Sequence, residues 1–247
     1  MTRLWDWIQR TYLRLIDPVA DWLVARGVHP NTITVIGTIC SIVGGVIYAT
    51  GHISTAGIWL GVTALFDVID GTVARRSGKS STFGAFFDST LDRVADGAVM
   101  GGLAVFYASS VVHHSTTMVI VCIAGILGAF VTSYTRARAE SLGIDAKVGL
   151  LQRPERVTLL AAPQGIFGLA LNGWVLIAIV CLLAVTSWIT AWQRVAFVYR
   201  VTRGSEAADT VPGRAGAGER ADATPAAGEA VAGRADVVSV SSNGGHA

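Results

Sequence analysis

Four aspartates within 26 residues could bind metal ions. Asp67 and Asp70 are three residues apart, and Asp88 and Asp92 are four apart. Each pair therefore lies on one face of a helix. Both pairs adjoin long apolar runs, where a charged group is costly and usually functional. Because carboxylate oxygen is the ligand that Mg²⁺, Mn²⁺ and Ca²⁺ prefer, two facing pairs predict a site for hard divalent cations.

The residues around these aspartates suit a phosphate or a nucleotide. Gly71 directly follows the first pair, and its missing side chain permits a phosphate to approach the backbone closely. Arg75 offers a planar guanidinium that can bind phosphate through two hydrogen bonds. Gly84 lies one helical turn before the second pair and lets two helices pack closely. Residues 76–82, between the pairs, are basic and rich in hydroxyl groups, as a phosphate-binding loop would be.

The composition places these residues in a membrane. Of 247 residues, 52% are hydrophobic and only 15% are charged, which is too apolar for an ordinary soluble domain. We expect an all-α integral membrane protein with six transmembrane helices, each long enough to cross a hydrocarbon core of about 30 Å. The six segments are about Thr34–Thr50, Thr55–Val73, Phe83–Ser109, Thr116–Thr135, Arg156–Leu171 and Trp174–Ala196. Asn172-Gly173 predicts a tight turn before the last of them.

The flanking segments differ from the membrane domain, which we place at residues 30–203. Residues 4–16 combine apolar residues at helical spacing with arginines, so we expect an amphipathic helix in the membrane interface. A second short helix should run to about Arg26 and end at Gly27, which completes a juxtamembrane region of residues 1–29. Residues 204–247 are mostly Gly, Ala, Ser and scattered charges, which predicts a disordered tail.

The positive charges predict the orientation. The loops on one side contain histidines but no Lys or Arg, whereas the other side carries the arginines of both termini, of residues 75–76 and of the later loops. Because cytoplasmic loops are enriched in Lys and Arg, we expect both termini and the aspartates at the cytoplasmic face of the cell membrane.

The spacing D-x2-D-G-x2-A-R-x8-G-x3-D-x3-D is present without a departure from Asp67 to Asp92. This stretch resembles the signature of the CDP-alcohol phosphatidyltransferase family. The resemblance extends to the six predicted spans, the interfacial helix and the cytoplasmic site. It implies that an alcohol hydroxyl attacks the lipid-bearing phosphorus of a CDP-linked lipid and that CMP is released.

The resemblance also implies roles for individual residues. The ligands of two Mg²⁺ or Mn²⁺ ions would be Asp67, Asp70, Asp88 and Asp92. Asp92 would in addition be the catalytic general base. Contacts to the CDP-lipid would come from Asn31, Thr32, Ile33, Thr34, Asp67, Gly71, Arg75 and Ser81. The chemistry is consistent, because two close cations stabilise charge on the attacking and leaving oxygens, and a nearby carboxylate can take the hydroxyl proton.

A second basic cluster indicates the acceptor. It contains S-Y-T-R-A-R-A-E from Ser133, R-P-E-R from Arg153, and a late Gln-Arg pair. These segments resemble the phosphatidylinositol-phosphate synthase branch of the family, which implies myo-inositol phosphate as the acceptor. The phosphate-binding residues would be Ser133, Arg136, Arg153, Arg156 and Arg194. The branch usually has lysine where this chain has Arg136, so glycerol 3-phosphate or another polar alcohol is an alternative acceptor.

Two alternatives remain from the residues alone. Intramembrane aspartates also occur in cation or proton transporters, or serve as polar contacts between helices. The expected partners are CDP-diacylglycerol, the acceptor alcohol and the lipid bilayer, with no nucleic acid. Small residues also favour a homodimer, although they serve internal packing as often; these are Gly101, Gly102, Gly125 and Gly128.

Overall fold

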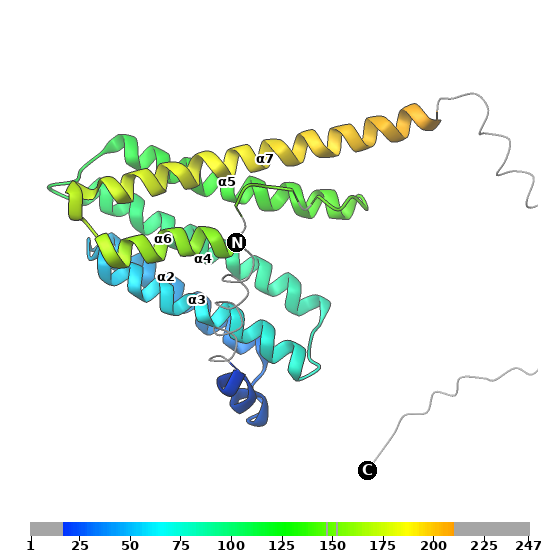
Figure 1. Ribbon diagram of the computed structural model, residues 1–247, viewed down its shortest axis with the longest axis horizontal. Helices are drawn as coiled ribbons and strands as arrows, with labels where there is room; N and C mark the ends of the chain where they lie inside the picture. Colours follow the sequence, from blue (N-terminus) through cyan, green and yellow to red (C-terminus); the bar gives the residue numbers. More distant parts are fainter. Residues whose placement is uncertain (1–16, 147, 152, 210–247) are drawn as a thin grey trace, which may run out of the picture. The chain divides into compact units, whose positions relative to one another are not determined.

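A computed structural model describes residues 17–146, 148–151 and 153–209 of the chain. Within these ranges every regular element is a helix (Figure 1). The long helices are α2 (Pro30–Ala49), α3 (Ile53–Arg76), α4 (Thr82–Ser109), α5 (Thr116–Ser141), α6 (Arg153–Phe167) and α7 (Trp174–Asp209), with a short 3₁₀ helix, η1 (Ala170–Gly173), before α7. The all-α prediction is confirmed, and each predicted span falls on one of these helices.

Among the described residues, four segments are long and apolar enough to cross a membrane: α2, α3, α5 and residues 170–203. The chain is therefore a multi-pass integral membrane protein. Helices α4 and α6 do not meet this criterion of length and hydropathy, and each has a different reason. The first half of α4 carries Asp88, Asp92, Arg93 and Asp96, and α6 has only 15 residues. Six spans thus remain a prediction.

The flanking segments are described only in part. Residues 17–25 are helical, and Gly27 follows with a φ of 72°, as expected for a helix that ends at glycine. The predicted interfacial helix at residues 4–16 lies outside the described residues. So does the predicted disordered tail, apart from residues 204–209. These six residues continue α7, so the prediction of disorder was wrong there; Glu206, Ala207 and Ala208 are good helix formers.

Capping residues and glycines set the helix ends near the site. Ser81 accepts a hydrogen bond from the amide of Gly84 (3.0 Å) and caps the N-terminus of α4. The predicted fifth span was too long, because α6 ends at Phe167 and Gly168 follows with a φ of 51°. The predicted turn at Asn172-Gly173 is present, with both residues at positive φ.

Close contacts between backbones hold α2 and α4 together. A Cβ atom at Gly102 would collide with the carbonyl group of Gly45, so only glycine fits at this crossing. Two more of the glycines named for a homodimer also pack inside the chain: Gly125 against Met100 and Gly128 against Trp188. The homodimer remains a prediction that these three glycines no longer support.

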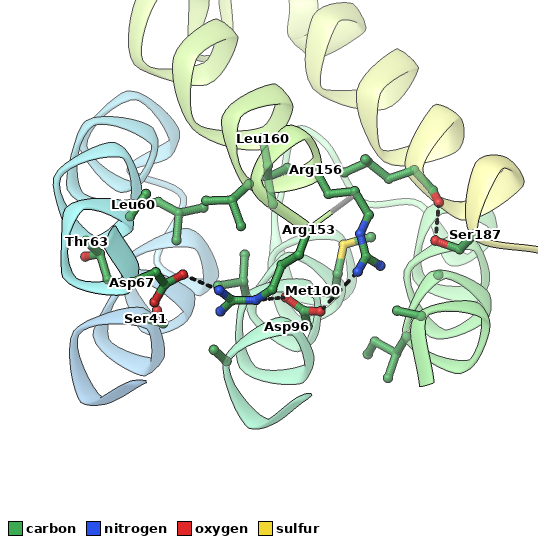
Figure 2. A pocket seen from close by; sticks show the side chains of 18 residues that line it. Ser41, Leu60, Thr63, Asp67, Asp96, Met100, Arg153, Arg156, Leu160 and Ser187 are labelled. Atoms are coloured by element: carbon green, nitrogen blue, oxygen red, sulfur yellow. Dashed lines mark hydrogen bonds and ion pairs between the residues drawn. The ribbon is translucent and has the colours of Figure 1, made fainter. Parts of the chain in front are cut away.

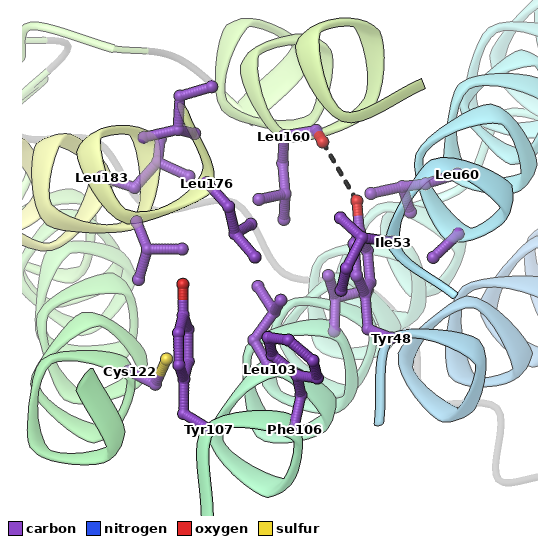
Figure 3. Packing of buried hydrophobic residues seen from close by; sticks show 14 of the residues in the cluster. Tyr48, Ile53, Leu60, Leu103, Phe106, Tyr107, Cys122, Leu160, Leu176 and Leu183 are labelled. Atoms are coloured by element: carbon purple, nitrogen blue, oxygen red, sulfur yellow. Dashed lines mark hydrogen bonds between the residues drawn. The ribbon is translucent and has the colours of Figure 1, made fainter. Parts of the chain in front are cut away.

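A buried apolar cluster lies beneath the site (Figure 3). Its side chains come from α2 to α7 and include Leu103 and Leu176, both fully buried. The hydroxyl of Tyr48 donates a hydrogen bond to the carbonyl oxygen of Leu160 (3.0 Å), which ties α2 to the middle of α6. This core fixes α3, α4 and α6, the three helices that carry the charged residues described next.

Candidate active site

The four signature aspartates lie on α3 and α4. Asp70 is buried and accepts a hydrogen bond from the hydroxyl of Thr34 on α2 (2.7 Å). Asp88 on α4 lies close enough to Asp67 and Asp70 on α3 for repulsion between their carboxylates, and Asp92 lies close enough to Asp67. The structure therefore brings both pairs together, as the sequence predicts. Such a concentration of negative charge requires cations nearby.

One of these cations is Arg153, the first residue of α6. Its guanidinium forms an ion pair with Asp67 and a second one with Asp92 (2.9 Å). It also approaches Asp96, with 3.9 Å between the nearest N and O atoms. Figure 2 shows the Arg153 side chain between Asp67 and Asp96. Arg153 thus links α3, α4 and α6, and it contacts two predicted metal ligands.

Asp96 lies at the centre of an arginine cluster. Its carboxylate is 3.7 Å from the guanidinium of Arg93 and 3.8 Å from that of Arg156. The Nε atoms of Arg93, Arg153 and Arg156 are buried and make no hydrogen bond within the described chain. Buried donors without acceptors are costly. The cluster is therefore suited to an anionic ligand that supplies several oxygen atoms.

The remaining predicted acceptor residues border this cluster. Ser133 on α5 accepts a hydrogen bond from Arg93. Arg194 on α7 donates to the carbonyl oxygens of Val148 (2.9 Å) and Thr132 (2.5 Å). Arg136 is half-exposed and pairs with Glu140 (2.8 Å), so it lies at the rim rather than among the buried arginines.

A cavity of about 60 Å³ opens below the arginine cluster (Figure 2). Asp67, Asp96, Arg153 and Arg156 line its charged end. Its other walls are mostly apolar and come from the core, including Leu60, Val99, Met100 and Leu160. We call this cavity the inner pocket.

A second cavity, of about 220 Å³, lies between the N-terminal end of α2, the C-terminal end of α3 and the start of α4. We call it the outer pocket. Seven of the residues predicted to bind CDP-lipid or metal line it: Asn31, Thr34, Asp70, Gly71, Arg75, Ser81 and Asp88. Lys79 adds a positive charge.

Three residues predicted to contact CDP-lipid are placed elsewhere. Ile33 is buried against Ala20 and Val73, and Thr32 is exposed; neither lines the outer pocket. On a helix the side chains at successive positions point in different directions, so the unbroken run 31–34 could not all reach one cavity. Asp67 lines the inner pocket instead.

The four signature aspartates are suitable ligands for divalent cations, because all of them are carboxylates and they come from two neighbouring helices. Within the described residues, however, no three acidic, histidine or cysteine side chains already surround one point as a metal-binding group would. Arg153 and Thr34 contact oxygens of Asp67, Asp92 and Asp70. Metal binding here requires these carboxylates to exchange partners.

Sequence reasoning assigned no ligand to Arg93 or Asp96. Arg93 joins the aspartates to Ser133, and Asp96 joins three arginines. A signal was present, because both are charged residues within a predicted span and such residues are usually functional. Arg93 and Asp96 are three residues apart on α4, but Ser133, Arg153 and Arg156 come from α5 and α6, which local spacing cannot reveal.

Comparisons with known proteins agree with this geometry. Residues 27–199 match the family model described as CDP-alcohol phosphatidyltransferase. The chain belongs to the CDP-alcohol phosphatidyltransferase family. It is therefore an enzyme of the phosphotransferase class. The matched range includes α2 to α6 and most of α7, and so contains both pockets.

Relatives within the family are similar over most of their length. Phosphatidylinositol phosphate synthase of Mycobacteroides abscessus is 37% identical over 190 residues, which cover 75% of this chain and 84% of that protein. A crystal structure of Mycobacterium tuberculosis phosphatidylinositol phosphate synthase with CDP-DAG bound has a TM-score of 0.69 at 33% identity, covering 75% of this chain and 94% of that one. The same enzyme in complex with manganese and citrate gives 0.68 at 33% identity, covering 74% and 88%.

Proposed function

We propose that this phosphatidyltransferase moves a phosphatidyl group from CDP-diacylglycerol to myo-inositol phosphate, forming phosphatidylinositol phosphate and CMP. One observation carries the proposal: two pockets flank the signature aspartates, and one offers a nucleotide-binding loop while the other ends in buried arginines. The names of the similar synthases, and the CDP-DAG bound to one of them, support the same reaction.

The outer pocket would hold the CDP part of the donor. Gly71 leaves the backbone accessible beside Asp70, and Arg75 and Lys79 offer positive charge to the pyrophosphate. Gly84 lies near both pocket walls, since a Cβ at this position would lie 3.1 Å from the hydroxyl oxygen of Ser81 and 3.5 Å from the side-chain oxygen of Asn31. Residues in the first turns of α2 and of α4 line the pocket.

The four aspartates would hold Mg²⁺ or Mn²⁺, most simply as two ions. Divalent cations bound there would stabilise negative charge on the attacking and leaving oxygens. Asp67 and Asp70 would provide ligands from α3, and Asp88 and Asp92 from α4. The manganese complex of the Mycobacterium tuberculosis synthase supports a metal of this class.

The inner pocket would hold the acceptor. Its phosphate would accept hydrogen bonds from Arg153 and Arg156, with Ser133, Arg194 and the rim residue Arg136 nearby. An acceptor hydroxyl would then lie near Asp92, which would take its proton as the hydroxyl oxygen bonds to phosphorus. The bond between that phosphorus and the bridging oxygen breaks, and its electron pair leaves with CMP.

The membrane arrangement follows from the helices and the charges. We infer six spans, with α4 and α6 crossing beside the four more apolar segments, and with both termini and the site at the cytoplasmic face of the plasma membrane. Residues 1–29 would lie at the membrane surface, and residues 210–247 would form a flexible tail. A homodimer is retained in this proposal, although it rests on no contact in the structure.

The test is CMP release by the purified full-length protein in detergent, with CDP-diacylglycerol and Mg²⁺. Myo-inositol phosphate, free inositol and glycerol 3-phosphate are offered separately. The proposal expects release that requires both the metal and the phosphorylated inositol. Equal release with glycerol 3-phosphate would overturn the acceptor assignment. Absence of release with every alcohol, combined with cation flux in vesicles, would favour the transporter.

A further inference from the structure

The guanidinium of Arg153 and a divalent cation would compete for the same two carboxylates. Arg153 pairs with Asp67 and, at 2.9 Å, with Asp92, which are both proposed metal ligands. Each carboxylate offers about four lone-pair sites, so a hydrogen bond from the guanidinium leaves fewer of them for a metal ion. Two cations in the same place also repel each other. Metal binding and this position of Arg153 therefore oppose each other.

The structure offers Arg153 an alternative position nearby. Asp96 lies 3.9 Å from its Nε atom, and that Nε atom is buried without a hydrogen bond in the described chain. Arg156, one turn further along α6, already faces Asp96 and the inner pocket. A small rotation of the Arg153 side chain would keep its contact with Asp96 and turn the guanidinium from Asp67 toward the inner pocket.

The charges determine when this rotation is favourable. In the structure, three positive charges neutralise three negative ones: the arginines are Arg93, Arg153 and Arg156, and the aspartates are Asp67, Asp92 and Asp96. When divalent cations neutralise the signature aspartates, the arginines retain only Asp96 and become an uncompensated group of positive charges. Buried charges without partners are costly. A phosphorylated ligand in the inner pocket removes this cost.

We propose that Arg153 couples the two halves of the site: an anion in the inner pocket draws Arg153 from Asp67 and Asp92 and thereby strengthens metal binding, and metal binding strengthens anion binding in return. Because linkage is reciprocal, both ligands gain affinity by the same factor. The proposal rests on the proposed function, since it assumes that the aspartates bind metal and that the inner pocket binds a phosphate.

The test is Mn²⁺ binding, measured by titration calorimetry on the full-length protein in detergent without CDP-diacylglycerol. The anions are myo-inositol phosphate and, separately, sulfate, which does not depend on the identity of the alcohol. In the wild type each anion should lower the Kd for Mn²⁺ by about tenfold, within the usual range of coupling between sites. Arg153→Gln should bind Mn²⁺ tightly without an anion, and the anion should then change Kd less than about twofold.

Two further variants make the test specific. Arg138→Gln removes an exposed arginine whose guanidinium bonds to the Ser141 hydroxyl, and it should behave as the wild type. Arg153→Lys keeps the charge but lacks the planar guanidinium that bridges two carboxylates, so the anion should change its Kd for Mn²⁺ less than in the wild type. If Arg153→Gln does not fold, Arg153→Lys takes its place in the comparison.

The outcomes separate the inference from the function on which it rests. Tight Mn²⁺ binding by the wild type without any anion, or equal coupling in the wild type and in Arg153→Gln, would overturn the inference and leave the function intact. Equal coupling would mean that the anion attracts the metal directly. Failure of every variant to bind Mn²⁺ would overturn the proposed metal site itself.

Discussion

At the scale of single residues, the site is a set of opposite charges at short range. Asp92 is largely buried and forms an ion pair with Arg153, which lines the inner pocket. A general base must be ionised and within hydrogen-bonding reach of the hydroxyl. Arg153 places a positive charge beside the Asp92 carboxylate, and helix α4 fixes its position.

Asp92→Asn should therefore abolish turnover without unfolding the protein. Asparagine has nearly the same shape but cannot accept the proton, and general bases contribute about 10² to 10⁴-fold in rate. CMP release and the thermal midpoint are measured together. Asp21→Asn is the matched control, because it alters a carboxylate in an exposed ion pair with Arg76 and should leave the rate within about twofold. Retained activity in Asp92→Asn would remove it as the base.

The grouping of site residues could be predicted from the sequence where their spacing along one helix reveals it. The four aspartates share helix faces by spacing alone, and the structure gathers them as predicted. The role of Asp96 was not predictable in this way, because its three arginines come from α4 and α6 and meet only after folding. Ile33 differs for the opposite reason: a contiguous motif was assigned to one pocket, whereas the helix turns the Ile33 side chain into the core, so its contact with CDP-lipid stays a prediction.

At the scale of elements, the relative position of α3 and α4 sets the distance between the two aspartate pairs. Helix α2 packs against both of them, and its contact with α4 has no room for side chains at Gly45 and Gly102. Hydropathy predicted where these helices lie in the sequence, because long apolar runs are unambiguous. It did not place the end of α6, which depends on the single backbone conformation of Gly168.

Gly102→Ala should therefore destabilise the protein, whereas Gly101→Ala should not. A methyl group at residue 102 meets the backbone of α2, but one at residue 101 has no other atom within 4 Å. We expect a fall of several degrees in the thermal midpoint for the first variant. The second should show no fall, and even a slight rise, since alanine favours a helix over glycine by about 1 kcal/mol. Equal midpoints for the two variants would contradict the packing described here.

At the scale of the whole molecule, the chain carries a charged site within a largely apolar bundle. Arg75, Arg76 and Lys79 follow the site at the end of α3, and the loop after α4 contains no Lys or Arg. The composition was enough to predict a membrane protein, and the loop charges predict an orientation that is a proposal. They could not predict the two pockets, because these form only where α2, α3, α4 and α6 converge.

The orientation can be measured with single cysteines in a variant that lacks Cys40, Cys122 and Cys181. A cysteine in place of Val111, which is 98% exposed in the loop after α4, should react with an impermeant maleimide added outside intact cells. A cysteine in place of Lys79 should react only after the membrane is opened. The reverse pattern would invert the proposed topology.

The separation of the two pockets has a stereochemical consequence. Asp67 lines the inner pocket and Asp70 lines the outer one, so the aspartates stand between the acceptor and the nucleotide. The new bond to phosphorus would form on the face opposite the departing CMP. CDP-diacylglycerol can be made chiral at its lipid-bearing phosphorus by replacing one non-bridging oxygen with sulfur. The product formed from it should have the inverted configuration at phosphorus. Retention would require two successive displacements and a covalent phosphatidyl-enzyme between them.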